Sequence, residues 1–189
     1  MAEPRQGLGS FFRAILGYID ERGLRDELRG QVSSETRALI DAPPRPLSFI
    51  SSRPIDEIEA AVQRIAGPDA CVECGLAAAR PLGWSLLQPV LRVCFAMFGQ
   101  SPGSIFENLD RFFSLVTRGI SFQFEAGTKG GEVRARFEGA DVPEAAFHVL
   151  RGTLLFALEV SGTRGEVEPH VVVESQPSVT VVRYRVRWS

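Results

Sequence analysis

The fold is decided by residues 120–138, which read ISFQFEAGTKGGEVRARFE. In both arms of this stretch, residues 120–125 and 133–138, apolar side chains alternate with polar ones. A period of two is typical of a strand with one buried face and one solvent-facing face. The glycine-rich residues 127–131 separate the arms and favour a tight turn rather than a phosphate-binding loop, because no helix follows them. We therefore predict a β-hairpin here.

The sequence after the hairpin predicts one helix and two more strands. Pro143-Glu144 opens the helix and Ser161-Gly162 ends it. Its inward side carries Ala146, Val149, Leu150, Leu154, Ala157 and Leu158. Residues 167–173 and 179–188 have strand composition, and Gln176-Pro177-Ser178 marks a turn between them. The last strand places Val182, Tyr184, Val186 and Trp188 on one face. The tail therefore has β-β-α-β-β order.

The sequence before residue 119 has helical periodicity. Residues 9–29 predict an amphipathic helix with Ser10 as its N-cap and Gly23 as a point where it can break. Residues 33–40 predict a shorter helix. The next helix begins near Pro54 and has Ile55, Ile58, Val62 and Ile65 on one face.

Three further helices are predicted in the middle of the chain. Gly67-Pro68 ends one helix and starts another, which runs to Ala79. Pro81-Leu82-Gly83 separates that helix from residues 84–98, which are apolar nearly all round and typical of a buried central helix. Ser101-Pro102 opens the last one, with Ile105, Leu109, Phe112, Phe113 and Val116 inward.

This order of elements indicates an α+β fold, in which an N-terminal helical bundle packs on a four-stranded antiparallel sheet. We expect residues 1–189 to form a single domain. Its parts are the N-terminal helices (1–41), a helical core (42–118) and the sheet portion (119–189).

Composition excludes several classes of protein. The net charge of −2 argues against a nucleic-acid partner held by bulk positive charge. No apolar run approaches the roughly 18 residues that span a bilayer, and Met1 to Gly9 do not resemble a signal peptide. Three cysteines are an odd number, which argues against a disulfide framework and favours a cytoplasmic location.

The residues with metal or redox chemistry are few and scattered. Cys71 and Cys74 form a C-x-x-C pair, but zinc needs four ligands, and only Cys94, His148 and His170 remain. A thioredoxin-like role requires a strand before the pair, and none is predicted. We therefore expect Cys71 and Cys74 to be structural, with metal or redox roles as alternatives. Cys94 is expected in the core, and His148 as a haem ligand is a minor alternative.

No constellation indicates an enzyme. The chain has no G-x-S-x-G, no G-x-x-x-x-G-K-[ST] and no strand-linked G-x-G-x-x-G. The arginines of the last strand and of residues 134–136 form a basic row, for which two interpretations stay open. One is a solvated face balanced by glutamates, and the other is a surface for an anionic partner.

Phenylalanines in the helical middle favour an apolar ligand pocket, although such a stripe also fits a solid core. The candidate ligand-binding residues are Phe95, Phe98, Phe106 and Phe113. We expect no cofactor.

Three segments carry a resemblance to a known family: residues 9–21 (GSFFRAILGYIDE), residues 91–101 (LRVCFAMFGQS) and the tail that ends in YRVRW at Trp188. With these segments the chain resembles a paralogous family of uncharacterised myxobacterial proteins. The same order of elements is similar to haem-nitric-oxide and vinyl-reductase-type sensor domains, and distantly to subunits of vesicle-tethering complexes. These groups imply small-molecule sensing, apolar ligand binding or dimeric scaffolding.

Two departures from those groups limit what the resemblance implies. The chain lacks the Tyr-x-Ser-x-Arg that haem sensors use and the C-terminal cysteines of metal-binding vinyl-reductase-type domains. Haem and zinc are therefore not expected. The sequence predicts a non-enzymatic cytoplasmic sensor or adaptor domain that binds an apolar small molecule between helices and sheet, as a homodimer or with another signalling protein. The alternative is a protein-interaction scaffold without a ligand.

Overall fold

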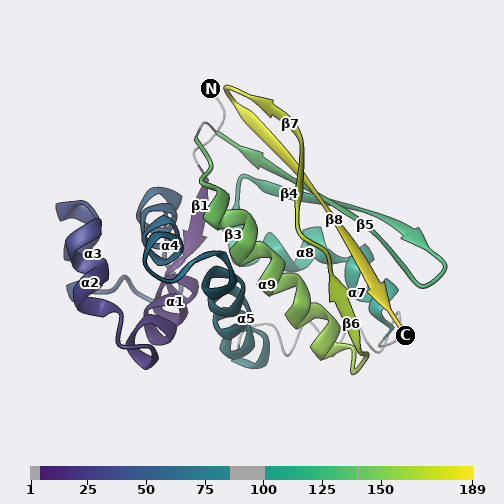
Figure 1. The fold of residues 1–189 in the computed structure, drawn as a ribbon, viewed down its shortest axis with the longest axis horizontal. Helices are drawn as coiled ribbons and strands as arrows, with labels where there is room; N and C mark the ends of the chain where they lie inside the picture. Colours follow the sequence, from purple (N-terminus) through teal and green to yellow (C-terminus); the bar gives the residue numbers. More distant parts are fainter. Residues whose placement is uncertain (1–4, 86–100, 140) are drawn as a thin grey trace.

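The computed structural model describes residues 5–85, 101–139 and 141–189. In Figure 1, helices from the first half of the chain lie beside a sheet from the second half, and α9 runs between them. The described elements follow in chain order: β1 (Gln6–Leu8), α1 (Gly9–Glu21), α2 (Arg25–Gln31), α3 (Ser34–Asp41), β2 (Phe49–Ser51), α4 (Ser52–Ala66), α5 (Pro68–Ser85), α7 (Pro102–Glu107), α8 (Leu109–Phe113), β3 (Thr117–Arg118), β4 (Ile120–Gly127), β5 (Gly130–Glu138), α9 (Glu144–Val160), β6 (Gly165–Val167), β7 (Val171–Gln176) and β8 (Val179–Trp188).

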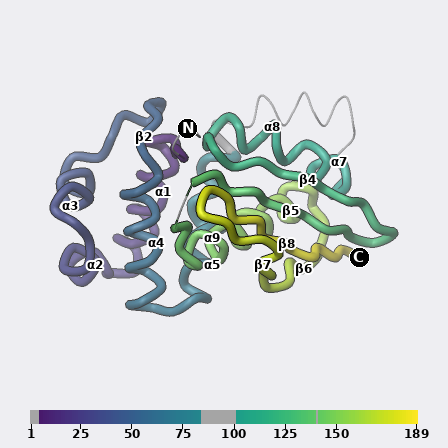
Figure 2. The backbone as a smooth tube through the Cα atoms, turned by 90° about the horizontal axis from the view of Figure 1, so that it is seen from above, coloured from purple at the N-terminus to yellow at the C-terminus, as the bar shows by residue number. Residues whose placement is uncertain are grey.

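The second half forms a five-stranded antiparallel sheet in the order β4-β5-β8-β6, with β7 also paired to β8. Phe122 of β4 lies opposite Ala135 of β5, and Val133 of β5 lies opposite Tyr184 of β8. These four side chains are buried, whereas Arg134 between them is exposed. Helices α7, α8 and α9 cover the buried face, and Figure 2 shows α7 and α8 beside β4. The predicted hairpin and the α+β class are confirmed.

The sheet has one strand more than predicted, because the segment expected as a single strand at 167–173 forms two. Strand β6 ends at Val167 and β7 begins at Val171, and both pair with β8. Pro169 lies between them. Proline has no N–H to donate to the ladder, so the pairing is interrupted there. A second sheet, in the order β2-β1-β3, was not predicted, because strands of two or three residues are too short to show a period.

The first predicted helix is divided in two. Helix α1 ends at Glu21, Gly23 adopts a positive φ of 67°, and α2 follows. The prediction of Ser10 as N-cap was wrong, since α1 already begins at Gly9. The backbone N–H groups of Gly9 and Ser10 donate instead to the carbonyls of Ser48 and Pro46, 2.8 Å away in each case. Loop carbonyls thus replace the side-chain cap.

The prediction that Pro81 ends a helix was also wrong, because α5 continues through it to Ser85. The lost backbone hydrogen bond is tolerated where packing holds the helix. Leu82 and Gly83 are buried, and Gly83 lies directly against the ring of Phe156 on α9. The predicted helix over 101–116 instead divides at Asn108, whose side-chain amide donates to the carbonyl of Ser104 over 2.8 Å. Residues 86–98 of the predicted central helix lie outside the described residues.

Helices α5 and α9 pack along one another and join the two halves of the fold. Gly75 of α5 and Gly152 of α9 form the contact. A Cβ at Gly75 would overlap the carbonyl of Val149, and a Cβ at Gly152 would overlap the carbonyl of Val72. The absence of these two side chains therefore lets the helix backbones touch. Helix α9 contributes to both hydrophobic clusters, one around the N-terminal helices and one under the sheet.

Candidate functional site

A cavity of about 130 Å³ lies where the two halves of the fold meet. Its walls come from β1, α1, α4, α5, α7, α8, β3, β4, β5 and α9. Most of the lining is apolar and includes Leu109, Phe113, Phe137, Leu150, Phe156 and Ala157. An engineered apolar cavity of roughly 150 Å³ stays dry and binds benzene or xenon. The volume therefore suits a guest of about one six-membered ring.

The polar part of the wall is a buried ion pair between Arg5 and Asp56. The Arg5 guanidinium donates to both carboxylate oxygens of Asp56, over 2.6 and 3.2 Å, and the Ser52 hydroxyl donates to Asp56 over 3.3 Å. Arg5 is 7% exposed, and its guanidinium lies 5.9 Å from the centroid of the Phe137 ring. Burial raises the pKa of Asp56, and the charge of Arg5 opposes that rise. The charges of Arg5 and Asp56 thus compensate each other within the wall.

Glu59 lines the same cavity one turn further along α4 and has no such partner. Its side chain is 4% exposed. Among the residues that the structure describes, none donates a hydrogen bond to its carboxyl group, and its backbone carbonyl accepts from the Cys71 thiol at 3.7 Å. Burial raises the pKa of Glu59 well above its usual value, the charge of Asp56 raises it further, and Arg5 lowers it. The burial of this side chain therefore favours the neutral, protonated form of its carboxyl group.

This buried acid makes stability depend on pH. Below its ordinary pKa of about 4.3, Glu59 is protonated in both the folded and the unfolded chain and contributes no difference. Above that value the unfolded chain releases the proton and the folded chain keeps it, so the free energy of unfolding falls until the pH reaches the raised pKa of the folded state. We expect Glu59→Gln to be more stable than the parent, by an amount that grows with pH over this window. Urea melts at several pH values measure it, and a constant difference would contradict the assignment.

Cys71, Cys74, His148 and His170 are not among the residues that line the cavity. Cys71 and Cys74 are buried in α5 as free thiols, and burial raises the pKa of Cys71 to about 12, with Glu59 adding to the rise. They are therefore poor nucleophiles. His148 and His170 form an edge-on ring pair at 5.0 Å, each with its Nε2 within 3.8 Å of Glu144. Within the described ranges, no three metal-binding side chains gather closely enough to hold an ion.

The sequence matches no family model and no curated protein. Solved structures resemble the fold. The Fe(II) unliganded H-NOX protein from K. algicida superposes with a TM-score of 0.69 at 12% identity, over 96% of each chain. An oxygen-binding H-NOX domain related to soluble guanylate cyclases, in its oxygen complex, gives 0.64 at 11% identity over 96% and 94%. The chain has the H-NOX fold. This agrees with the resemblance to haem-nitric-oxide sensor domains, while kinship with the myxobacterial family and with vinyl-reductase-type domains stays a prediction.

Within the H-NOX fold, the four predicted ligand-binding phenylalanines occupy different environments. Phe113 lines the cavity. Phe106 is buried in the core under the sheet, where its ring stacks on Trp188 at 5.8 Å, and it is not part of the cavity wall. Phe95 and Phe98 lie outside the described residues, as does Cys94. That any of the four binds a ligand stays a prediction.

The sequence prediction missed the polar wall of the cavity, although one signal for it exists. Glu59 follows Ile55 by four residues and precedes Val62 by three, so it falls on the apolar face of α4. A carboxylate on such a face is rarely buried without a role. Asp56 and Arg5 carry no comparable signal, because their pairing depends on β1 lying beside α4.

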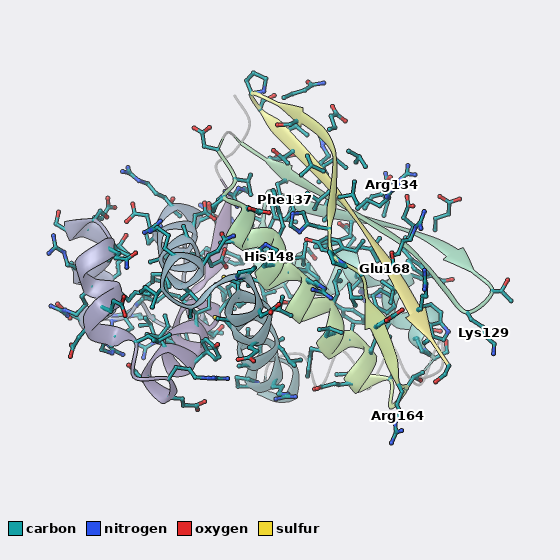
Figure 3. All side chains as sticks on the ribbon, in the orientation of Figure 1. Lys129, Arg134, Phe137, His148, Arg164 and Glu168 are labelled. Carbon is teal, nitrogen blue, oxygen red and sulfur yellow. The ribbon has the colours of Figure 1, made fainter. Side chains whose placement is uncertain are left out.

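Three arginines of the basic row on the sheet of this H-NOX fold, Arg134, Arg183 and Arg187, are paired with glutamates. Glu132 lies within ion-pair distance of Arg134 and Arg183, and Arg187 bonds Glu168 at 2.5 Å and Glu166 at 3.5 Å. Figure 3 shows Arg134 and Glu168 on the side of the sheet away from the helices, with Lys129 at the tip of the hairpin. These pairs support the interpretation as a solvated, charge-balanced face.

Proposed function

We propose that the chain is a sensor or adaptor domain that binds an uncharged, mostly apolar small molecule in its central cavity. The observation that carries the proposal is the position of that cavity. Its walls come from α4 and α5 on one side and from α9, α8 and β5 on the other. A guest there contacts both halves of the fold. It can therefore favour one relative arrangement of them over another, which is the physical requirement for sensing.

Haem does not fit the described walls of this cavity. Structures similar to the chain hold Fe(II) or an oxygen complex, and one of them concerns haem distortion in the H-NOX family. Haem iron in proteins is held by histidine, cysteine, methionine or tyrosine. None of these residue types is among the described residues that line the cavity. Arg5, which could pair with an anionic group on a ligand, is already bonded to Asp56. We therefore propose an organic guest and route no chemistry through iron.

Narrowing the cavity tests the proposal. Ala157 lies on α9 in the cavity wall, so Ala157→Leu places three more carbon atoms in the space of the guest. We expect this variant to lower the affinity for methylenecyclohexane, followed by NMR titration, by about tenfold or more. Ala38→Leu makes the same change at an exposed position of α3 and should leave the affinity unchanged.

A second measurement looks for the natural guest. In native mass spectrometry, the protein purified from its host should carry an additional mass that denaturation releases and that Ala157→Leu lacks. A protein with no bound mass, together with no NMR response to methylenecyclohexane, would overturn the proposal. That outcome would favour the interaction scaffold without a ligand.

Three features of the sequence hypothesis remain proposals. We propose that the domain signals through a second copy or another protein rather than by catalysis, and that it acts in the cytoplasm. Among the described residues, no helix is both long and apolar enough to cross a bilayer. Size-exclusion chromatography with light scattering tests the dimer, since a single species of 20.7 kDa would contradict it.

A further inference from the structure

The wall of the cavity carries a polar group that the fold itself does not use. The hydroxyls of Thr117 and Thr153, which also line the space, donate to the carbonyls of Phe113 and Val149. Arg5 and Asp56 are bonded to each other. The carboxyl group of Glu59 accepts no hydrogen bond from any residue in the described part of the chain, although Glu59 is only 4% exposed. A buried polar group without a partner costs free energy unless a ligand or water supplies one.

The surroundings of Glu59 decide what kind of partner it can take. The titratable groups that face it are Asp56 on its own helix, Arg5 beside β1, and the thiols of Cys71 and Cys74 on α5. Asp56 is already paired with Arg5, so a second negative charge at Glu59 would have no cation beside it. Burial raises the pKa of both thiols, which therefore stay neutral near pH 7 and do not add charge. A neutral acid has one O–H to donate, and the natural partner is an acceptor oxygen.

We propose that Glu59 donates a hydrogen bond to a carbonyl or ether oxygen of the guest. The ligand class is then an uncharged molecule of about one six-membered ring, with an apolar body and a single acceptor oxygen, such as a cyclic ketone. This inference rests on the proposed function, because it concerns the same cavity. It adds the feature by which the cavity distinguishes an oxygenated guest from a hydrocarbon of the same shape.

Two probes of equal shape separate this inference from binding by the apolar walls. Cyclohexanone and methylenecyclohexane differ only in an oxygen against a CH₂ group, and only the ketone accepts a hydrogen bond. The affinity of the alkene, corrected for the different transfer free energies of the two probes from water to hydrocarbon, gives the affinity that the ketone would have without a hydrogen bond. We expect the protein at pH 6 to bind the ketone about tenfold more tightly than this reference. NMR titration of both probes measures the two affinities.

Variants at Glu59 show whether this side chain is the donor. Glu59→Gln keeps an N–H donor in the same place and should retain the preference for the ketone. Glu59→Leu should lose the preference but still bind the alkene. Glu27→Gln, at an exposed position of α2, is the matched control and should change nothing. Should Glu59→Leu not fold, the pH profile replaces it. The preference of the parent should fall in alkaline solution as Glu59 ionises, and that of Glu59→Gln should not.

Each outcome has one meaning. If the two probes bind the parent protein equally well after correction for their transfer from water to hydrocarbon, the role of Glu59 is overturned, while the cavity proposal stands. Failure of both probes to bind overturns both proposals. Tighter binding of cyclohexylammonium than of cyclohexanone overturns the assignment of Glu59 as a neutral donor.

Discussion

Gly152→Ala should destabilise the protein by about 3 kcal/mol or more, although it adds a single carbon atom. The new Cβ would overlap the carbonyl oxygen of Val72 and the backbone around Leu76 on α5. Backbone atoms cannot rotate away as a side chain does, so the two helices must separate. Since α5 and α9 join the two halves of the fold, the loss should appear in global unfolding, measured by urea melts.

The matched control for this variant is Gly17→Ala in the interior of α1. A Cβ at Gly17 meets nothing within 4 Å, so the variant should gain up to about 1 kcal/mol from helix propensity. If Gly152→Ala behaves like Gly17→Ala, the close contact between α5 and α9 does not hold the fold together.

Arg5→Ala should cost about 3 to 5 kcal/mol, because it leaves the Asp56 carboxylate buried without its cation. Arg5 and Asp56 are 7% and 17% exposed, and two hydrogen bonds join them. The double variant with Arg5→Met and Asp56→Leu should lose much less, since it removes the charge together with its partner. Thermal and urea unfolding of the three proteins measures the difference.

An exposed ion pair provides the comparison. Arg80 and Glu159 are joined by a hydrogen bond of 2.6 Å, but their side chains are 52% and 44% exposed. Arg80→Ala should therefore cost less than about 1 kcal/mol. A loss of the same size for Arg5→Ala and Arg80→Ala would show that burial of the first pair has no energetic consequence.

The elements that the sequence predicts well are those whose signal is local. The alternation in residues 120–138 specifies a hairpin, and the structure pairs Phe122 with Ala135 as the alternation requires. Ser33 is followed by a helix, and its side chain accepts a hydrogen bond from the backbone of Thr36 at 3.2 Å. Periodicity also identifies α9, because its apolar positions recur over seventeen residues.

Features that depend on contacts between distant residues were not predictable from one sequence. Pro81 stays inside α5 because Leu82 and Gly83 are buried, the latter against Phe156. The strands β1, β2 and β3 exist only because three short segments meet. The candidate site shows the same division. The helical spacing predicts Phe113 on the inner face of its helix, and this residue lines the cavity. The ion pair of Arg5 and Asp56 appears only once the chain is folded.

The account rests on a cavity at the junction of the two halves that admits an apolar guest. Xenon is the most direct probe, because it occupies dry apolar cavities without needing a specific contact. Crystals of the protein under xenon pressure should show a xenon atom between Phe113, Phe137 and Phe156, and crystals of Ala157→Leu should show little or none there. Xenon absent from this position in the parent protein would contradict the account, whatever other sites it occupied.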